Sequence, residues 1–182
     1  PNDAAREELL AATIDAGVAW RRVTAGHELR IGSVVAEVTS PPRPDWERPR
    51  VRNEDSVVIR IRYAAVEILL TGDAGGEFEA TAEGGSQGAR LRVIKVGHHG
   101  SRGSSSDAFV AKLQPDIALV SVGRQNLFGH PAPVVLSRYA AAGAELFRTD
   151  VDGGVVVDTD GREVRVETAT GKQYRLLEWP VR

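Results

Sequence analysis

Residues 91–106 constrain the fold of this chain more than any other stretch. An apolar run, residues 91–96, is followed by Gly97, the adjacent histidines His98 and His99, and a segment rich in glycine and serine. This pattern predicts a strand, a tight loop and then the start of a helix. Imidazoles in such a loop can bind a metal ion, and free N–H groups at a helix start can bind an anion.

Two further polar side chains follow predicted strands. Asp73 comes shortly after the apolar run 66–70, and His130 lies in the polar loop after the predicted strand 116–122. Strand ends gather at one edge of a parallel or mixed sheet, where layered α/β proteins commonly bind ligands. We therefore expect both side chains to lie near the adjacent histidines. The alternative is that Asp73 only caps a weak helix over residues 77–83.

Composition restricts the kind of site that these residues can form. The chain has 182 residues, 42% of them hydrophobic, which suits a single domain with a core of small aliphatic side chains. It has no cysteine, so a metal site would use His, Asp or Glu. The formal net charge of −2 provides no general basic field for nucleic acid, so any DNA contact would be local. No apolar run is long enough for a membrane span, and no signal peptide is visible.

The remaining pattern predicts one domain over residues 1–182 with three parts. A packing helix occupies 1–17, with Leu9, Leu10, Thr13 and Ile14 as its buried stripe; the sheet and helix core spans 18–161; a C-terminal strand and tail fill 162–182. The expected strands and helices of the core are 20–24, 28–39, 56–62, 66–70, 107–114, 116–122 and a helix from 131 or 133 to 142. Residues 152–154 predict a hairpin turn between strands 146–149 and 155–157, and residues 160–161 a second turn.

The expected cluster has the chemistry of a metal site for phosphoryl transfer. Oxygen and nitrogen ligands suit zinc, manganese or iron, and a carboxylate such as Asp73 can bridge two metals about 3.5–4 Å apart. The helix start at residues 104–106 would add N–H donors for a phosphate oxygen. A catalytic zinc site usually has three protein ligands, however, and this chain offers at best two or three.

Several motifs together resemble one known family. In chain order they are Leu69-Leu70-Thr71-Gly72-Asp73, Val96-Gly97-His98-His99-Gly100-Ser101, Ser121-Val122-Gly123-Arg124-Gln125-Asn126, Gly129-His130-Pro131, Arg148-Thr149-Asp150 and Asp152-Gly153. This set, preceded by the segment 53–57, resembles the C-terminal metallo-β-lactamase-like domain of ComEC proteins, the DNA-uptake channel proteins of natural competence. The resemblance covers about residues 34–161. It implies an α/β fold, the αββα sandwich, and a hydrolase with two divalent metal ions, zinc or manganese.

The resemblance also implies roles for individual residues. Asp73 would match the bridging carboxylate, and His98, which directly follows the strand and Gly97, would be the metal ligand of the histidine pair. His99, Ser101 and His130 would contact the phosphodiester. Alternatively, His99 would contact a metal ligand without binding the metal itself. Glu79 would have a supporting role. The HxHxDH or HxDxDH string of such enzymes is absent, so we expect a partial sandwich, the second half of the domain.

Two classes of function follow from this resemblance. The first is a metal-dependent nuclease that degrades a single strand of DNA during uptake, at the extracytoplasmic face of the membrane and as part of a channel protein. Such a fragment would be incomplete alone and would expose apolar sheet. We expect a complementing chain, a swapped homodimer, or two short packed sheets with lost edges. The second is a non-catalytic DNA-binding or interaction module with a vestigial site. Another phosphoester or β-lactam hydrolase of the same fold is a further possibility.

Overall fold

The computed structural model of this protein describes residues 3–19, 21–42 and 52–178. Its helices are α1 (Asp3–Asp15), η1 (Asn53–Asp55), α2 (Gly76–Thr81), η2 (Gly97–Gly100), α3 (Asp107–Leu113), α4 (Pro133–Ala141) and α5 (Thr149–Asp152). Its strands are β1 (Glu28–Ile31), β2 (Val34–Ser40), β3 (Val58–Tyr63), β4 (Val66–Leu70), β5 (Leu91–Lys95), β6 (Ile117–Val120), β7 (Glu145–Arg148), β8 (Val155–Thr159), β9 (Glu163–Thr168) and β10 (Gln173–Leu177).

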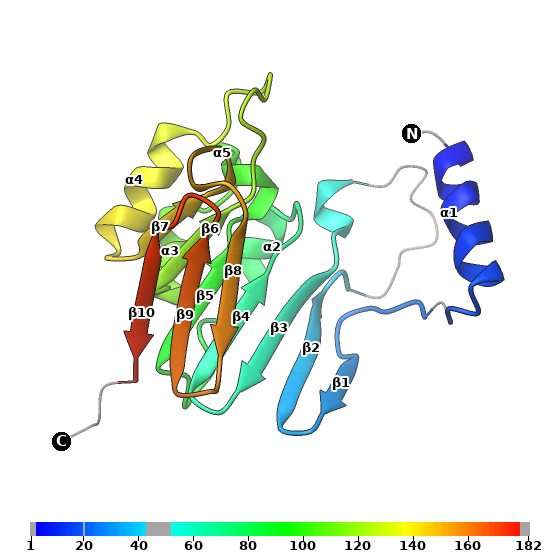
Figure 1. Cartoon of the computed structure of the whole chain (residues 1–182), viewed down its shortest axis with the longest axis horizontal. Helices are drawn as coiled ribbons and strands as arrows, with labels where there is room; N and C mark the ends of the chain where they lie inside the picture. The colour runs from blue at the N-terminus through cyan, green and yellow to red at the C-terminus, as the bar shows by residue number, and fades with distance from the viewer. Residues whose placement is uncertain (1–2, 20, 43–51, 179–182) are drawn as a thin grey trace.

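A large mixed sheet organises the molecule, with strands in the order β1-β2-β3-β4-β5-β6-β7 (Figure 1). The pairs from β1 to β4 are antiparallel, and the pairs from β4 to β7 are parallel. Short turns join β1 to β2 and β3 to β4, whereas residues 41–57 connect β2 to β3. The helices α2, α3 and α4 lie in the connections between the parallel strands. Leu70 of β4 is in register with Lys95 of β5, so the segments that follow these two strands leave the sheet side by side.

The helices α2, α3 and α4 cover one face of this sheet (Figure 1). Their apolar side chains, which include Phe78, Phe109 and Tyr139, pack on Leu69 and Ile94 of the sheet. Tyr139 and Ile94 are fully buried there. This core holds α2 and α3 against the strands, and so it fixes the loops that end β4 and β5.

A second, antiparallel sheet of β10, β9 and β8 covers part of the opposite face (Figure 1). Val164 and Val166 of β9 are buried against Val93, Ile117 and Phe147 of the large sheet. Within the described residues the layer order is therefore helices, sheet, sheet. This arrangement agrees with three of the four layers of the expected αββα sandwich.

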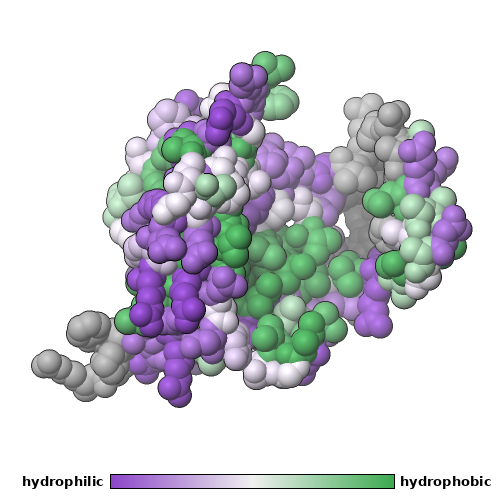
Figure 2. Space-filling model, in the orientation of Figure 1, coloured by the Kyte–Doolittle hydropathy of each residue, from purple (hydrophilic) through white to green (hydrophobic). Residues whose placement is uncertain are grey.

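No helix or strand of the described residues packs on the other part of that face. Figure 2 shows hydrophobic residues gathered between the second sheet and α1. Exposed hydrophobic side chains on or beside the first four strands are Leu29, Ile31, Val57 and Leu70. An exposed sheet was expected from the sequence, whereas the complementing chain or homodimer that would cover it stays a prediction.

The expected hairpin around residues 152–154 is wrong. β7 is the edge of the large sheet, and β8 belongs to the second sheet. The single turn α5 carries the chain from one sheet to the other, and Gly153 follows it with a positive φ of 71°. The Asp-Gly-Gly segment lies where the chain passes from one sheet to the other. A glycine with positive φ permits a sharp turn, whether or not the flanking strands pair. The turn at residues 160–161 does join the antiparallel pair β8 and β9, as expected.

Two N-terminal expectations also fail. Leu9 and Ile14 of α1 are 56% and 67% exposed, so the expected buried stripe is not buried. Alanine-rich helices form readily through backbone propensity without a broad apolar face. Residues 21–24 form no strand, and Trp20 lies outside the described residues. Thr24 instead begins a turn, in which its backbone N–H donates to the ring of His27 at 3.1 Å.

Candidate functional site

The loop after β5 has an unusual backbone. His98 and His99 both adopt left-handed conformations, with φ values of 46° and 54°. This region costs an ordinary residue about 1–2 kcal/mol, and such residues cluster at functional sites. Gly97 permits the close approach of the loop to its neighbour, because a Cβ atom there would lie 2.6 Å from the carbonyl oxygen of Ala74. The histidines therefore leave the sheet in a fixed, strained geometry.

Asp73 and His99 meet at this edge of the sheet. Oδ1 of Asp73 lies 3.4 Å from Nε2 of His99. Nδ1 of His99 lies 2.6 Å from the carbonyl oxygen of Ser121, an acceptor, so Nδ1 carries the proton of the neutral ring. The lone pair of Nε2 then points toward the side of Asp73. A histidine held by a carbonyl through one nitrogen is the usual arrangement when its other nitrogen binds a metal.

Lys95 is a third member of this cluster and was not among the site residues expected from the sequence. Its Nζ atom donates to the carbonyl oxygen of Gly72 at 2.7 Å and lies 3.9 Å from Oδ1 of Asp73. Burial lowers the pKa of Lys95, and the nearby Asp73 carboxylate opposes that shift. The only sequence signal for this residue is a charged side chain at the end of an apolar strand.

His98 points to a different partner. Nδ2 of Asn53, in the short helix η1, lies 3.1 Å from Nε2 of His98. The His98 ring packs edge-on against the ring of His130, with centroids 5.9 Å apart. The structure thus brings His98, His99, His130 and Asp73 into one region, as expected, and it places His99 rather than His98 beside the carboxylate.

The expected phosphate donors at the start of α3 are already occupied, which corrects the prediction for residues 104–106. The backbone N–H groups of Ser105 and Ser106 both donate to the carboxylate of Glu79, the second at 2.8 Å. The N–H of Ser104 donates to the carbonyl of Ser101 at 2.9 Å. Glu79 is only 7% exposed, so it acts as a buried cap from a neighbouring helix. The position of the Glu79 carboxylate depends on tertiary packing, so it could not be predicted from the local sequence.

Ser101 lies at the end of the histidine loop and is half-buried. Its backbone N–H donates to the carbonyl oxygen of His98 at 2.9 Å, and its Oγ accepts from the N–H of Gly103 at 3.4 Å. These bonds close the loop on itself. The hydroxyl proton of Ser101 can still be donated to another group.

The donors of the site do not make a complete metal centre. Across the part of the chain that the structure describes, no group of three or more His, Cys, Asp or Glu side chains could hold a metal ion. Asp73 and His99 are two donors of suitable chemistry, one fewer than a typical catalytic zinc site takes from protein. The described residues therefore fit a two-metal centre only in part.

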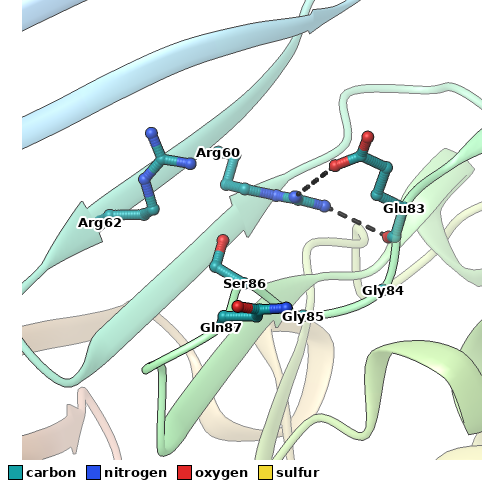
Figure 3. A pocket seen from close by; sticks show the side chains of 7 residues that line it. All are labelled: Arg60, Arg62, Glu83, Gly84, Gly85, Ser86 and Gln87. Carbon is teal, nitrogen blue, oxygen red and sulfur yellow. Dashed lines mark hydrogen bonds and ion pairs between the residues drawn. The ribbon is translucent and has the colours of Figure 1, made fainter.

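A cavity of about 400 Å³ lies elsewhere, lined by Arg60 and Arg62 of β3 and by residues 83–87 (Figure 3). The guanidinium of Arg60 points toward Glu83, whose carbonyl oxygen accepts from Nη2 at 3.2 Å. Residues 83–87 precede β5, whereas the histidines follow it, and the cavity contains none of the expected site residues. Nε of Arg60 also lies 3.7 Å from the buried carboxylate of Glu67, so we interpret the charged residues beside this cavity as structural.

Comparison with known proteins agrees with the fold. A model of the metallo-β-lactamase superfamily matches residues 15–124, a range that includes Asp73, His98 and His99. The mixed α/β architecture with its large sheet agrees with such a domain. The chain belongs to the metallo-β-lactamase superfamily.

Its relatives narrow this class and confirm the resemblance to the ComEC family. The chain is 34% identical to ComE operon protein 3 of Bacillus subtilis over 149 residues. This aligned region covers 82% of this chain and 19% of that protein. It is 35% identical over 115 residues to competence protein ComA of Neisseria gonorrhoeae, covering 62% of this chain and 16% of that protein. Recombination protein 2 of Haemophilus influenzae is 32% identical over 126 residues, or 68% of this chain and 15% of that protein.

The chain spans less than a fifth of the length of these curated relatives. No helix among residues 3–19, 21–42 and 52–178 is long and apolar enough to cross a membrane.

Proposed function

We propose that this chain forms part of a nuclease site that cleaves phosphodiester bonds of single-stranded DNA in a protein of natural competence. The observation that carries the proposal is the pair of Asp73 and His99, fixed 3.4 Å apart at the ends of two parallel strands. Membership of the metallo-β-lactamase superfamily and similarity to a competence protein support a hydrolytic role in this setting. Superfamily members usually bind divalent metals.

The geometry favours particular roles within this proposal. We assign Asp73 and His99 as the polar pair that provides metal donors, because Ser121 holds His99 in the tautomer that leaves Nε2 free. From the sequence alone we expected His98 to be the metal ligand. We instead place His98 with His130 and Ser101 on the substrate side, where imidazole nitrogens and a hydroxyl can hydrogen-bond to phosphate oxygens.

Two donors leave a metal centre incomplete. We propose that divalent metal ions, zinc or manganese and two in the complete site, bind only with donors from further protein. The candidate sources are the rest of the channel protein, a complementing chain or a second copy. In this proposal the chain alone is inactive, and the whole protein acts at the extracytoplasmic face of the membrane.

A cleavage assay tests this proposal. A fluorescently labelled single-stranded oligonucleotide is incubated with Mn²⁺ or Zn²⁺ and either this chain alone or the whole protein that contains it. We expect cleavage by the whole protein, its loss in EDTA, and at least a 10- to 100-fold loss in Asp73→Ala, as is typical when a metal-site group is removed. Asp107→Ala is the control, because Asp107 is 80% exposed and pairs with Arg138. Full cleavage by Asp73→Ala would contradict the proposal.

The second candidate function is a non-catalytic DNA-binding module. It is favoured by the lack of a metal-binding group of three among the described residues. The same assay separates the two functions, because the module binds the oligonucleotide without cleaving it in any divalent metal. If the protein neither binds nor cleaves DNA but hydrolyses another phosphoester or a β-lactam, that hydrolysis is its function.

A further inference from the structure

Two large apolar side chains stand in solvent beside the candidate site. Leu127 and Phe128, in the loop between β6 and α4, are 97% and 82% exposed. Single exposed hydrophobic residues are normal on protein surfaces. Here two of them are adjacent, and the loop that carries them continues to His130. They therefore lie next to the candidate site and not in the core.

The loop that carries them is held in place by hydrogen bonds. The Asn126 side chain donates to the carbonyl oxygen of His130 at 2.7 Å and accepts from the His130 N–H at 2.9 Å. Nε of Arg124 donates to the carbonyl oxygen of Asp150 at 3.3 Å. These bonds fix both ends of the segment 127–129. Its exposed ring is therefore presented in a preorganised position, which lowers the entropic cost of binding a ligand.

The rings of this region form a continuous series that ends at the site. Phe128 stacks on His130 with centroids 6.0 Å apart and an interplanar angle of 19°. His130 meets His98 edge-on at 5.9 Å, and His98 is adjacent to His99, which faces Asp73. The Phe128 ring is thus aligned nearly parallel with the His130 ring, and its 82% exposure leaves most of the Phe128 ring surface open to solvent.

We propose that Phe128 is a stacking platform for one unpaired base of a single-stranded nucleic acid, whose backbone passes the His98, His99 and Asp73 region. The inference rests on the proposed nuclease function and adds a residue that selects the substrate. Stacking on an aromatic ring accepts any base, as a degrading enzyme requires. A duplex buries its base faces within its own stack, so the platform favours single strands. A membrane contact is the alternative role for an exposed apolar loop. Insertion into lipid would not require the Phe128 ring to lie parallel to His130, so the observed alignment favours base stacking.

The test measures binding without cleavage. Fluorescence anisotropy is recorded in EDTA with a labelled single-stranded oligothymidylate and with an abasic strand of equal length. We expect Phe128→Ala to weaken oligothymidylate binding roughly 5- to 100-fold, the range typical of base stacking, and Phe128→Tyr to restore it. Leu127→Ala, the neighbouring exposed position, should change binding by less than about twofold. The abasic strand should bind weakly and equally to the unaltered chain and to Phe128→Ala.

Several results would overturn the proposal. These are equal effects of Phe128→Ala and Leu127→Ala, an equal loss with the abasic strand, or no base-dependent binding at all. Phe128-dependent binding to anionic phospholipid vesicles, with oligonucleotide binding unchanged, would identify a membrane contact instead. The outcome is separate from that of the cleavage assay. Base-dependent binding without cleavage in metal would leave Phe128 as a platform in a non-catalytic module, whereas cleavage unaffected by Phe128→Ala would remove this inference alone.

Discussion

Nε2 of His99 lies 3.4 Å from Oδ1 of Asp73, although 25 residues separate the two in the chain. Parallel pairing of β4 and β5 creates this contact, because Leu70 and Lys95 are in register at the ends of their strands. The helix α2 and its buried packing fill the connection between them. The site is therefore a direct consequence of the strand–helix–strand unit.

Glu79 should be a structural carboxylate. Glu79→Gln removes one of the two acceptors for the N–H groups of Ser105 and Ser106, and we expect unfolding to become easier by about 1–3 kcal/mol. Urea denaturation followed by circular dichroism measures this difference. Glu77→Gln on the same helix is the control, because Glu77 is 65% exposed and should matter by less than about 1 kcal/mol. Equal effects of both variants would refute the assignment.

Gly97 should tolerate no side chain. In Gly97→Ala the new Cβ would lie 2.6 Å from the Ala74 carbonyl oxygen, so the loop must shift. We expect a loss of about 1–3 kcal/mol in the free energy of unfolding, typical of overpacking. Gly123→Ala, where nothing lies within 4 Å of the added Cβ, should be close to neutral. Thermal melting measures the effect of both variants. An unchanged melting temperature for Gly97→Ala would show that the contact between Gly97 and the Ala74 carbonyl oxygen is not rigid.

The buried charges near the cavity of Figure 3 should be sensitive to neutralisation. Glu67 is 1% exposed, accepts from the N–H of Ser86 at 2.9 Å, and lies 3.7 Å from Nε of Arg60. Glu67→Gln leaves the buried Arg60 without this counter-charge, and we expect destabilisation by about 3 kcal/mol or more. Glu83→Gln, at an 89% exposed side chain, should change stability by less than about 0.5 kcal/mol. Chemical denaturation of both variants decides whether burial sets the difference.

Asp150 should contribute a pH-dependent part of stability. The bidentate hydrogen bonds with Arg148 hold the pKa of Asp150 below its usual value of 3.8. A carboxyl with a lowered folded-state pKa adds stability that is present above the unfolded value, and it is lost as pH falls through the folded pKa. Unfolding midpoints of the native chain should thus fall more steeply below about pH 4 than those of Asp150→Asn. Parallel curves for the two proteins would contradict this role.

The sequence indicated where the site lies because strand ends and polar loops are local patterns. The apolar runs before Asp73 and His98, with the loop around His130, placed all three at one sheet edge. The partner of His99 could not be predicted in the same way. The Ser121 carbonyl that orients its ring belongs to another strand connection, and the left-handed backbone of His98 and His99 turns the second ring, not the first, toward Asp73.

Other features depend on tertiary packing, which local patterns do not encode. Serines 105 and 106 form a proper helix start, yet Glu79 from α2 occupies the N–H groups that seemed free for phosphate. The Asp152-Gly153 turn carries the chain between sheets, although the same residues favour a hairpin elsewhere. Leu9 was expected inside the core, but the helix that carries it forms through its own propensity and leaves it exposed.

The central claim is that Asp73 and His99 act as one unit, and a double-mutant cycle on cleavage tests it most directly. The single-turnover rate of the whole protein on single-stranded DNA is measured for Asp73→Ala, His99→Ala and the double variant. Residues that act as a unit give strongly non-additive losses. We predict that each single change removes most of the activity and that the double variant is no slower than the slower single variant. Losses that multiply, or a His99→Ala variant with full activity, would contradict the account.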